Sequence, residues 1–124
     1  MVIDTGIFIE HLRAKDKTST TLFRLSDEPE LFISAVSLYE LYMGATTKEK
    51  MEDVKNITED LSILPFTDEV ALKAGEIYHH LRTTNKIIEF RDIFIAATCL
   101  TFNLPIATLN KKHFERIDQL RIFK

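Results

Sequence analysis

The chain has little of what usually marks a secreted, redox-active or nucleotide-dependent protein. Its 124 residues include one cysteine, three glycines, three prolines and no tryptophan. Cys99 cannot form an internal disulfide, and it lies in the apolar run "FIAATCL", so we interpret it as a small core side chain. No glycine-rich phosphate loop is present, which argues against a nucleotide-dependent enzyme.

Long apolar runs and a strong charge of one sign are also missing. No apolar stretch approaches the roughly 20 residues of a membrane span, and the start of the chain does not have the pattern of a signal peptide. We therefore expect a cytoplasmic protein with no membrane partner. The net charge of -3 argues against a strong non-specific nucleic-acid binder, although it leaves room for an enzyme with a local basic patch. The length and a hydrophobic content of 45% predict a single domain over 1–124.

Short apolar segments alternate with amphipathic or apolar helical patterns along the chain. Strands are expected at 1–4, 30–34, 62–66, 104–109 and 120–124. Helices are expected at 5–14, 17–26, 34–45, 47–61, 67–84, 91–103 and 111–117. This alternation predicts an α/β fold in which helices cover both faces of a parallel sheet.

Three acids stand in apolar segments where an unpaired charge is costly. Asp4 closes the first strand, Glu40 is the only charged residue in "FISAVSLYELYMGA", and Asp92 heads "DIFIAATCL". In a doubly wound sheet, the segments that follow the strands meet at one edge, where ligands bind. Three carboxylates that converge there stay ionised together only if a cation lies among them. All-oxygen ligands favour a hard ion such as Mg2+ or Mn2+.

Each of these acids also has an ordinary structural interpretation. Asp4 could cap the helix that follows it, and Asp92 could be an N-cap or a first-turn acid. Glu40 could be paired with a lysine or arginine across the core. The spacing of the acids leaves these alternatives open.

Basic residues follow the last expected buried strand. Lys111, Lys112, His113 and Arg116 form the best local basic patch at the predicted ligand edge, and they suit contacts with backbone phosphates of RNA. Arg91, next to Asp92, could contact an RNA phosphate or simply be solvated. The exposed face of a short helix is the alternative interpretation of the basic patch.

Four stretches together resemble the PIN-domain family, in particular the VapC-like toxin ribonucleases of type II toxin–antitoxin pairs. They are "VIDTGIFIEHL", "ISAVSLYELYMGA", "RDIFIAATCLTFNLPIATLNKKHFERI" and the strand ending "LRIF". The resemblance implies a PIN-like three-layer α/β/α sandwich with a short-stranded central parallel sheet. It also implies a metal-dependent endoribonuclease that acts on RNA, forms a homodimer and is inhibited by a small antitoxin protein.

The resemblance carries over to individual residues by their place in the motifs. It assigns the metal ligands Asp4, Glu40 and Asp92, the fourth catalytic position Asn110, and the supporting residues Thr108 and Glu115. With Mg2+ or Mn2+ held there, a water would attack the phosphodiester.

Two alternative functions follow from the same residues. Asn110 is neutral and the whole chain is acidic, so a catalytically weak or inactive PIN-like module that binds RNA or a partner protein is the first alternative. A nuclease that acts on DNA is the second, because recognition of the 2′-hydroxyl leaves no signature in the sequence.

Overall fold

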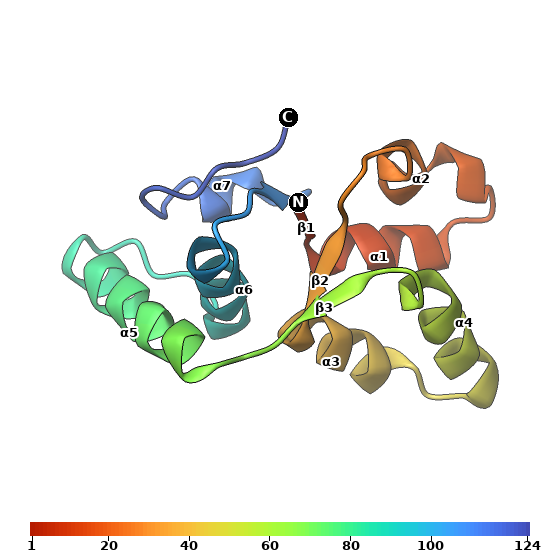
Figure 1. Cartoon of the computed structure of the whole chain (residues 1–124), viewed down its shortest axis with the longest axis horizontal. Coiled ribbons are helices and arrows are strands. Elements are labelled where there is room, and N and C mark those ends of the chain that lie inside the picture. Colours follow the sequence, from red (N-terminus) through yellow and green to blue (C-terminus); the bar gives the residue numbers. More distant parts are fainter.

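A computed structural model describes residues 1–124, and its centre is a sheet of four short parallel strands (Figure 1). The strands are β1 (Val2–Ile3), β2 (Phe32–Ser34), β3 (Ser62–Leu64) and β4 (Ile106–Ala107). Their order is β3-β2-β1-β4, so β1 lies inside the sheet with β2 and β4 as its neighbours. All pairs are parallel, and the carboxyl ends of the four strands therefore meet at one edge.

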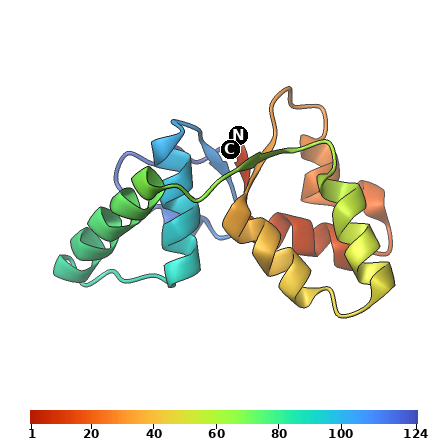
Figure 2. The same ribbon diagram turned by 60° about the horizontal axis from the view of Figure 1, so that its bottom comes forward.

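Helices cover both faces of this sheet. They are α1 (Thr5–Arg13), α2 (Thr21–Leu25), α3 (Ala35–Gly44), α4 (Lys48–Thr58), α5 (Asp68–Thr83), α6 (Phe90–Thr101) and α7 (Lys111–Phe114), with a short 3-10 turn, η1 (Lys17–Ser19), before α2. Figure 1 and Figure 2 show α5 and α6 together on one side of the strands and α1, α3 and α4 on the other. The predicted three-layer α/β/α sandwich with a short-stranded parallel sheet is confirmed.

Alternate residues of β1, β2 and β4 pack into two separate cores. Val2 and Ile106 join the core beneath α5 and α6, whereas Ile3 and Ala107 join the core beneath α1 and α4. This division follows from the two-residue period of a strand, and it requires apolar side chains on both faces. It explains why the strands appear in the sequence as continuous apolar runs.

Polar residues at the strand ends also begin the helices. The Asp4 carboxylate accepts a hydrogen bond from the Thr5 amide at the start of α1, and the Ser34 hydroxyl accepts one from the Ser37 amide at the start of α3. Such caps satisfy amide groups that have no partner within the helix. As a result, the carboxyl edge of the sheet carries a row of buried oxygen atoms.

Two expected elements differ from the observed ones. The expected strand at 120–124 is a single parallel bridge between Ile122 and Ile106, because the chain turns just before it at Gln119, whose φ is 67°. The expected helix at 17–26 is interrupted at Thr20, whose backbone is extended and whose hydroxyl caps α2 by accepting from the Phe23 amide. None of the helices is long and apolar enough to cross a membrane.

The two-core packing predicts a sharp contrast between two leucines of α5. Leu81 is fully buried and Leu72 is 68% exposed. We expect Leu81→Ala to lower the free energy of unfolding by about 3 kcal/mol and Leu72→Ala to change it by less than about 0.5 kcal/mol. Urea denaturation followed by circular dichroism measures both, and equal losses in the two variants would contradict the assigned core.

Candidate active site

Asp4 lies at the carboxyl end of the central strand and is only 6% exposed. Both of its carboxylate oxygens are held. The Thr5 amide donates to Oδ1 at 2.9 Å, and the Thr108 hydroxyl donates to Oδ2 at 2.7 Å. Asp4 is therefore the N-cap of α1, which is the first of the two interpretations that the sequence allows. Its second oxygen, Oδ2, does not cap the helix and contacts Thr108 in the segment that follows β4.

No cation of the chain compensates this buried charge. No lysine, arginine or histidine forms an ion pair with Asp4. Burial raises the pKa of Asp4 to about 6, the hydrogen bond from Thr108 opposes that rise, and the charges of Asp92 and Glu40 add to it. Asp4 is thus a carboxylate whose ionised form is disfavoured by its surroundings in the chain alone.

Glu40 is held at the site by a chain of buried hydroxyl groups. Each hydroxyl has one proton to donate, so the contacts fit one direction: Ser34 to Ser37 at 3.2 Å, Ser37 to Thr5 at 2.8 Å, and Thr5 to Glu40 Oε1 at 2.9 Å. The other oxygen, Oε2, is 3.5 Å from the guanidinium of Arg91. The alternative of an arginine partner for Glu40 is therefore realised, and α3 is tied to α6.

Asp92 lies in the first turn of α6, where a negative charge is favourable. Its Oδ2 is 3.2 Å from Nδ1 of His113, which belongs to α7. The same Nδ1 is 2.7 Å from the side-chain amide of Asn110. The side-chain nitrogen of Asn110 can only donate, so an Nδ1 that accepts from Asn110 has no proton to give to Asp92, and the two contacts exclude each other. Asn110 makes no hydrogen bond with Asp4.

The three predicted acids do not form a ready-made metal cluster. The charges of Asp92 and Glu40 both raise the pKa of Asp4, so the three carboxylates repel one another. No three His, Cys, Asp or Glu side chains are gathered closely enough to hold a metal ion. Glu40 turns to Arg91 and Asp92 turns to His113, so side-chain rotation is needed before all three could share one ion.

The donor set nevertheless fits a hard divalent cation. Three carboxylates offer oxygen atoms only, and the innermost of them, Asp4, has no compensating charge in the chain. The Thr108 hydroxyl donates a hydrogen bond to Asp4, and the Thr5 hydroxyl donates one to Glu40. Partners of this kind orient the ligands of metal sites.

The remaining predicted residues fall into different places. The Thr108 hydroxyl donates a hydrogen bond to Asp4 and accepts one from the backbone N–H of Asn110 at 2.9 Å. Glu115 is exposed and makes no hydrogen bond with the three acids, so its supporting role stays a prediction. Lys111 and Lys112 border two different surface pockets, which share Glu115 as a lining residue.

Sequence reasoning missed several of these contacts. The hydroxyl chain through Ser37 and Thr5 has no signature, although polar residues in an apolar helix start are a signal for buried hydrogen bonds. For Arg91 the sequence suggests only RNA or solvent, yet this residue pairs with Glu40 and also with Glu89, an acid three residues before Asp92.

Comparison with known proteins agrees with this architecture. A PIN domain family model matches residues 1–120. Ribonuclease VapC10 of Mycobacterium tuberculosis is 32% identical over 121 residues, which cover 98% of this chain and 90% of that protein. Ribonuclease VapC1 of Methanocaldococcus jannaschii is 29% identical over 120 residues, covering 96% of this chain and 82% of that protein.

A solved structure shows the same arrangement of elements. The DNA-bound VapBC structure from Salmonella typhimurium has a chain that aligns with a TM-score of 0.86 and 25% identity, over 98% of this chain and 95% of that chain. The protein therefore belongs to the PIN domain family, and the family predicted from the sequence motifs is confirmed. Within that family, both relatives named above are VapC ribonucleases.

The buried charge of Asp4 predicts how stability depends on pH in the presence of a chelator. The pKa of Asp4 is about 6 in the folded chain against an ordinary value of 3.8, so the folded chain binds the extra proton between these values and wild-type stability falls as pH rises through them. We expect Asp4→Asn to be more stable than wild type at pH 8, with the difference shrinking by about 2.5 kcal/mol between pH 8 and pH 4. Urea denaturation across that range measures it.

Asp16→Asn is the matched control for this experiment. Hydrogen bonds from Thr18 lower the pKa of the exposed Asp16 carboxyl, so this variant should lose stability relative to wild type as pH rises. The two variants should thus move in opposite directions. If the free energies of unfolding of Asp4→Asn and wild type differ by the same amount over the whole pH range, burial does not raise the pKa of Asp4.

Proposed function

We propose that this protein is a metal-dependent endoribonuclease, the toxin of a toxin–antitoxin pair, which hydrolyses phosphodiester bonds of RNA at the site formed by Asp4, Glu40 and Asp92. The observation that carries the proposal is the buried carboxylate of Asp4, which has no cationic partner in the chain and whose pKa is raised further by the charges of Asp92 and Glu40. Membership of the PIN domain family and similarity to VapC ribonucleases along nearly the whole chain support it.

Asp4, Glu40 and Asp92 would hold the cation, with Asn110 beside them. When bound, Mg2+ or Mn2+ supplies the positive charge that favours the hydroxide form of a water and offsets charge on the phosphodiester. The chain's own groups then have separate tasks. Thr108 keeps one oxygen of Asp4 fixed, and Thr5 donates a hydrogen bond to one oxygen of Glu40.

Arg91 and His113 hold the outer acids in place. Their nitrogen atoms lie 3.5 Å from Glu40 and 3.2 Å from Asp92, respectively. Arg91 also brings a positive charge to the rim of the site, where an RNA phosphate would approach. In our proposal Arg91 serves first as a partner of Glu40 and also as a contact for the substrate.

A small antitoxin protein is the proposed regulatory partner. The solved relative is a VapBC complex. In this chain, a groove between α1, α3 and α4 includes Glu40 in its lining. Its apolar lining residues include Ile9, Leu12, Leu41 and Val54, and its charged ones include Lys50. An antitoxin segment seated there would reach the acids. A homodimer and a cytoplasmic location stay predictions.

The alternative function, an inactive module that binds RNA or a protein, rests on the pairing of the outer acids. Glu40 and Asp92 already have cationic or imidazole partners in the chain, and Asn110 adds no charge. This alternative predicts binding without turnover. It is distinguished from the proposed function by cleavage assays alone.

The test is cleavage of a labelled mixed-sequence RNA by purified, antitoxin-free protein with Mg2+, with Mn2+ and with chelator. Wild-type protein should cut RNA only with a divalent cation. Asp4→Asn should reduce the rate of RNA cleavage by at least about a hundredfold. This is the upper end of the loss in activity when a residue that only supports a metal ligand is changed, and Asp4 would be a ligand itself. Single-stranded DNA of the same sequence tests the choice of RNA over DNA.

Asp16→Asn makes the same chemical change at an exposed site on η1 and should keep the wild-type rate. Full activity of Asp4→Asn would contradict the site assignment. Absence of cleavage by folded wild-type protein under every condition would contradict the proposed activity and support the binding module.

A further inference from the structure

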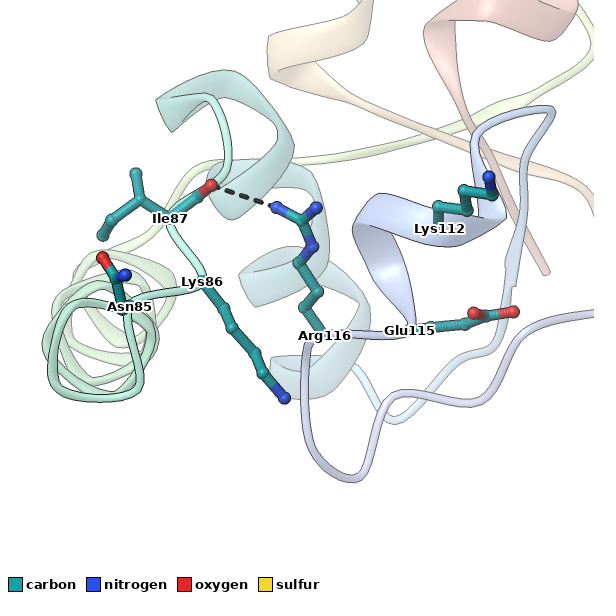
Figure 3. A pocket seen from close by; sticks show the side chains of 6 residues that line it. All are labelled: Asn85, Lys86, Ile87, Lys112, Glu115 and Arg116. Carbon is teal, nitrogen blue, oxygen red and sulfur yellow. Dashed lines mark hydrogen bonds between the residues drawn. The ribbon is translucent and has the colours of Figure 1, made fainter.

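A polar pocket lies outside the acid site, between α7 and the loop that joins α5 to α6 (Figure 3). It has a volume of about 450 Å³, and its lining residues are Asn85, Lys86, Ile87, Lys112, Glu115 and Arg116. Figure 3 shows Lys86 extending from the loop on the side of Arg116, whereas Lys112 lies on the far side of Arg116 and its ammonium points away from Lys86. Three cations thus border one small pocket in a chain whose net charge is -3.

The cations of this pocket have few partners within the chain. Lys86 and Lys112 are exposed and form no ion pair. Arg116 donates one hydrogen bond, to the Ile87 carbonyl oxygen at 3.2 Å, which joins the two walls and leaves its other N–H groups free (Figure 3). Glu115 is the one acid of the lining, so the pocket keeps an excess of positive charge.

The two walls of the pocket also build the acid site. The loop with Lys86 leads within a few residues to Asp92 in the first turn of α6. On the other wall, Lys112 precedes His113, whose ring contacts Asp92 at 3.2 Å. Both walls of the pocket are therefore continuous in the chain with residues of the candidate acid site, and we expect RNA bound at that site to extend to the pocket.

We propose that this pocket binds a backbone phosphate of the RNA substrate. This inference rests on the proposed ribonuclease function and adds Lys86 as a residue that the sequence did not single out. Ile87 is the only apolar lining residue, so the pocket lacks the apolar anchor on which protein partners usually depend. Contacts of ammonium and guanidinium groups with phosphate position a strand without selecting its bases.

The test measures RNA binding without cleavage. A 5′-fluorescein-labelled, mixed-sequence single-stranded RNA is titrated by anisotropy with Asp4→Asn protein in chelator, at several KCl concentrations. Adding Lys86→Gln and Lys112→Gln together should raise Kd about tenfold at moderate salt. It should also lower the slope of log Kd against log salt by about 0.7 for each RNA phosphate that the variant no longer neutralises.

The matched control changes two lysines with the same net effect on charge. Lys15 follows α1 and Lys55 lies in α4; both are exposed and neither forms an ion pair. In the same background, Lys15→Gln with Lys55→Gln should change Kd by less than about twofold, because these residues lie away from the pocket. Equal weakening by the two pairs would overturn the proposal, since it would show a general charge effect.

Failure of this inference is separable from failure of the proposed function. If wild-type protein cuts RNA but the pocket pair binds RNA like the control pair, the subsite is wrong and the ribonuclease stands. If no protein cuts RNA but the pocket pair alone weakens binding, the activity is wrong and the subsite stands. If Asp4→Asn protein has no measurable affinity for the RNA, the subsite is overturned.

Discussion

The structure of the candidate site depends on one constraint, the burial of the Asp4 carboxylate without a cation from the chain. Asp4 is fixed at the end of the central strand by its own cap contact with Thr5 and by the hydroxyl of Thr108. It cannot swing into solvent without loss of both bonds and of the start of α1. Its charge must therefore be accommodated where it is, by a raised pKa or by a positive ligand.

The other acids meet a different constraint, because they come from helices and have partners of their own. Glu40 lies 3.5 Å from Arg91, which also pairs with Glu89, and Asp92 lies 3.2 Å from Nδ1 of His113. The inner part of the site is rigid and the outer part can rearrange. A fixed inner carboxylate with two movable outer ones suits a site in which the outer carboxylates rotate toward a cation bound by the inner one.

The sequence could predict the fold and the acids, because burial leaves a strong pattern. A lone acid in an apolar segment is conspicuous, and Asp4 does lie buried at the end of the central strand. Contacts that depend on tertiary packing left no such pattern: Ser37 and Thr5 form a hydrogen-bonded chain only once α1 and α3 are packed together. The strand expected at the end of the chain failed for a local reason, a turn just before Ile122 that leaves a single bridge.

Calorimetric titration of Mn2+ into metal-free protein, without RNA, tests whether a single divalent-cation site lies around Asp4. We expect saturable Mn2+ binding by wild type, and at least about tenfold weaker binding after Asp4→Asn, Glu40→Gln or Asp92→Asn. Asp118→Asn, an exposed acid near His80, should bind as wild type does. Binding by Asp4→Asn equal to that of wild type, or no saturable binding by wild type, would contradict the account.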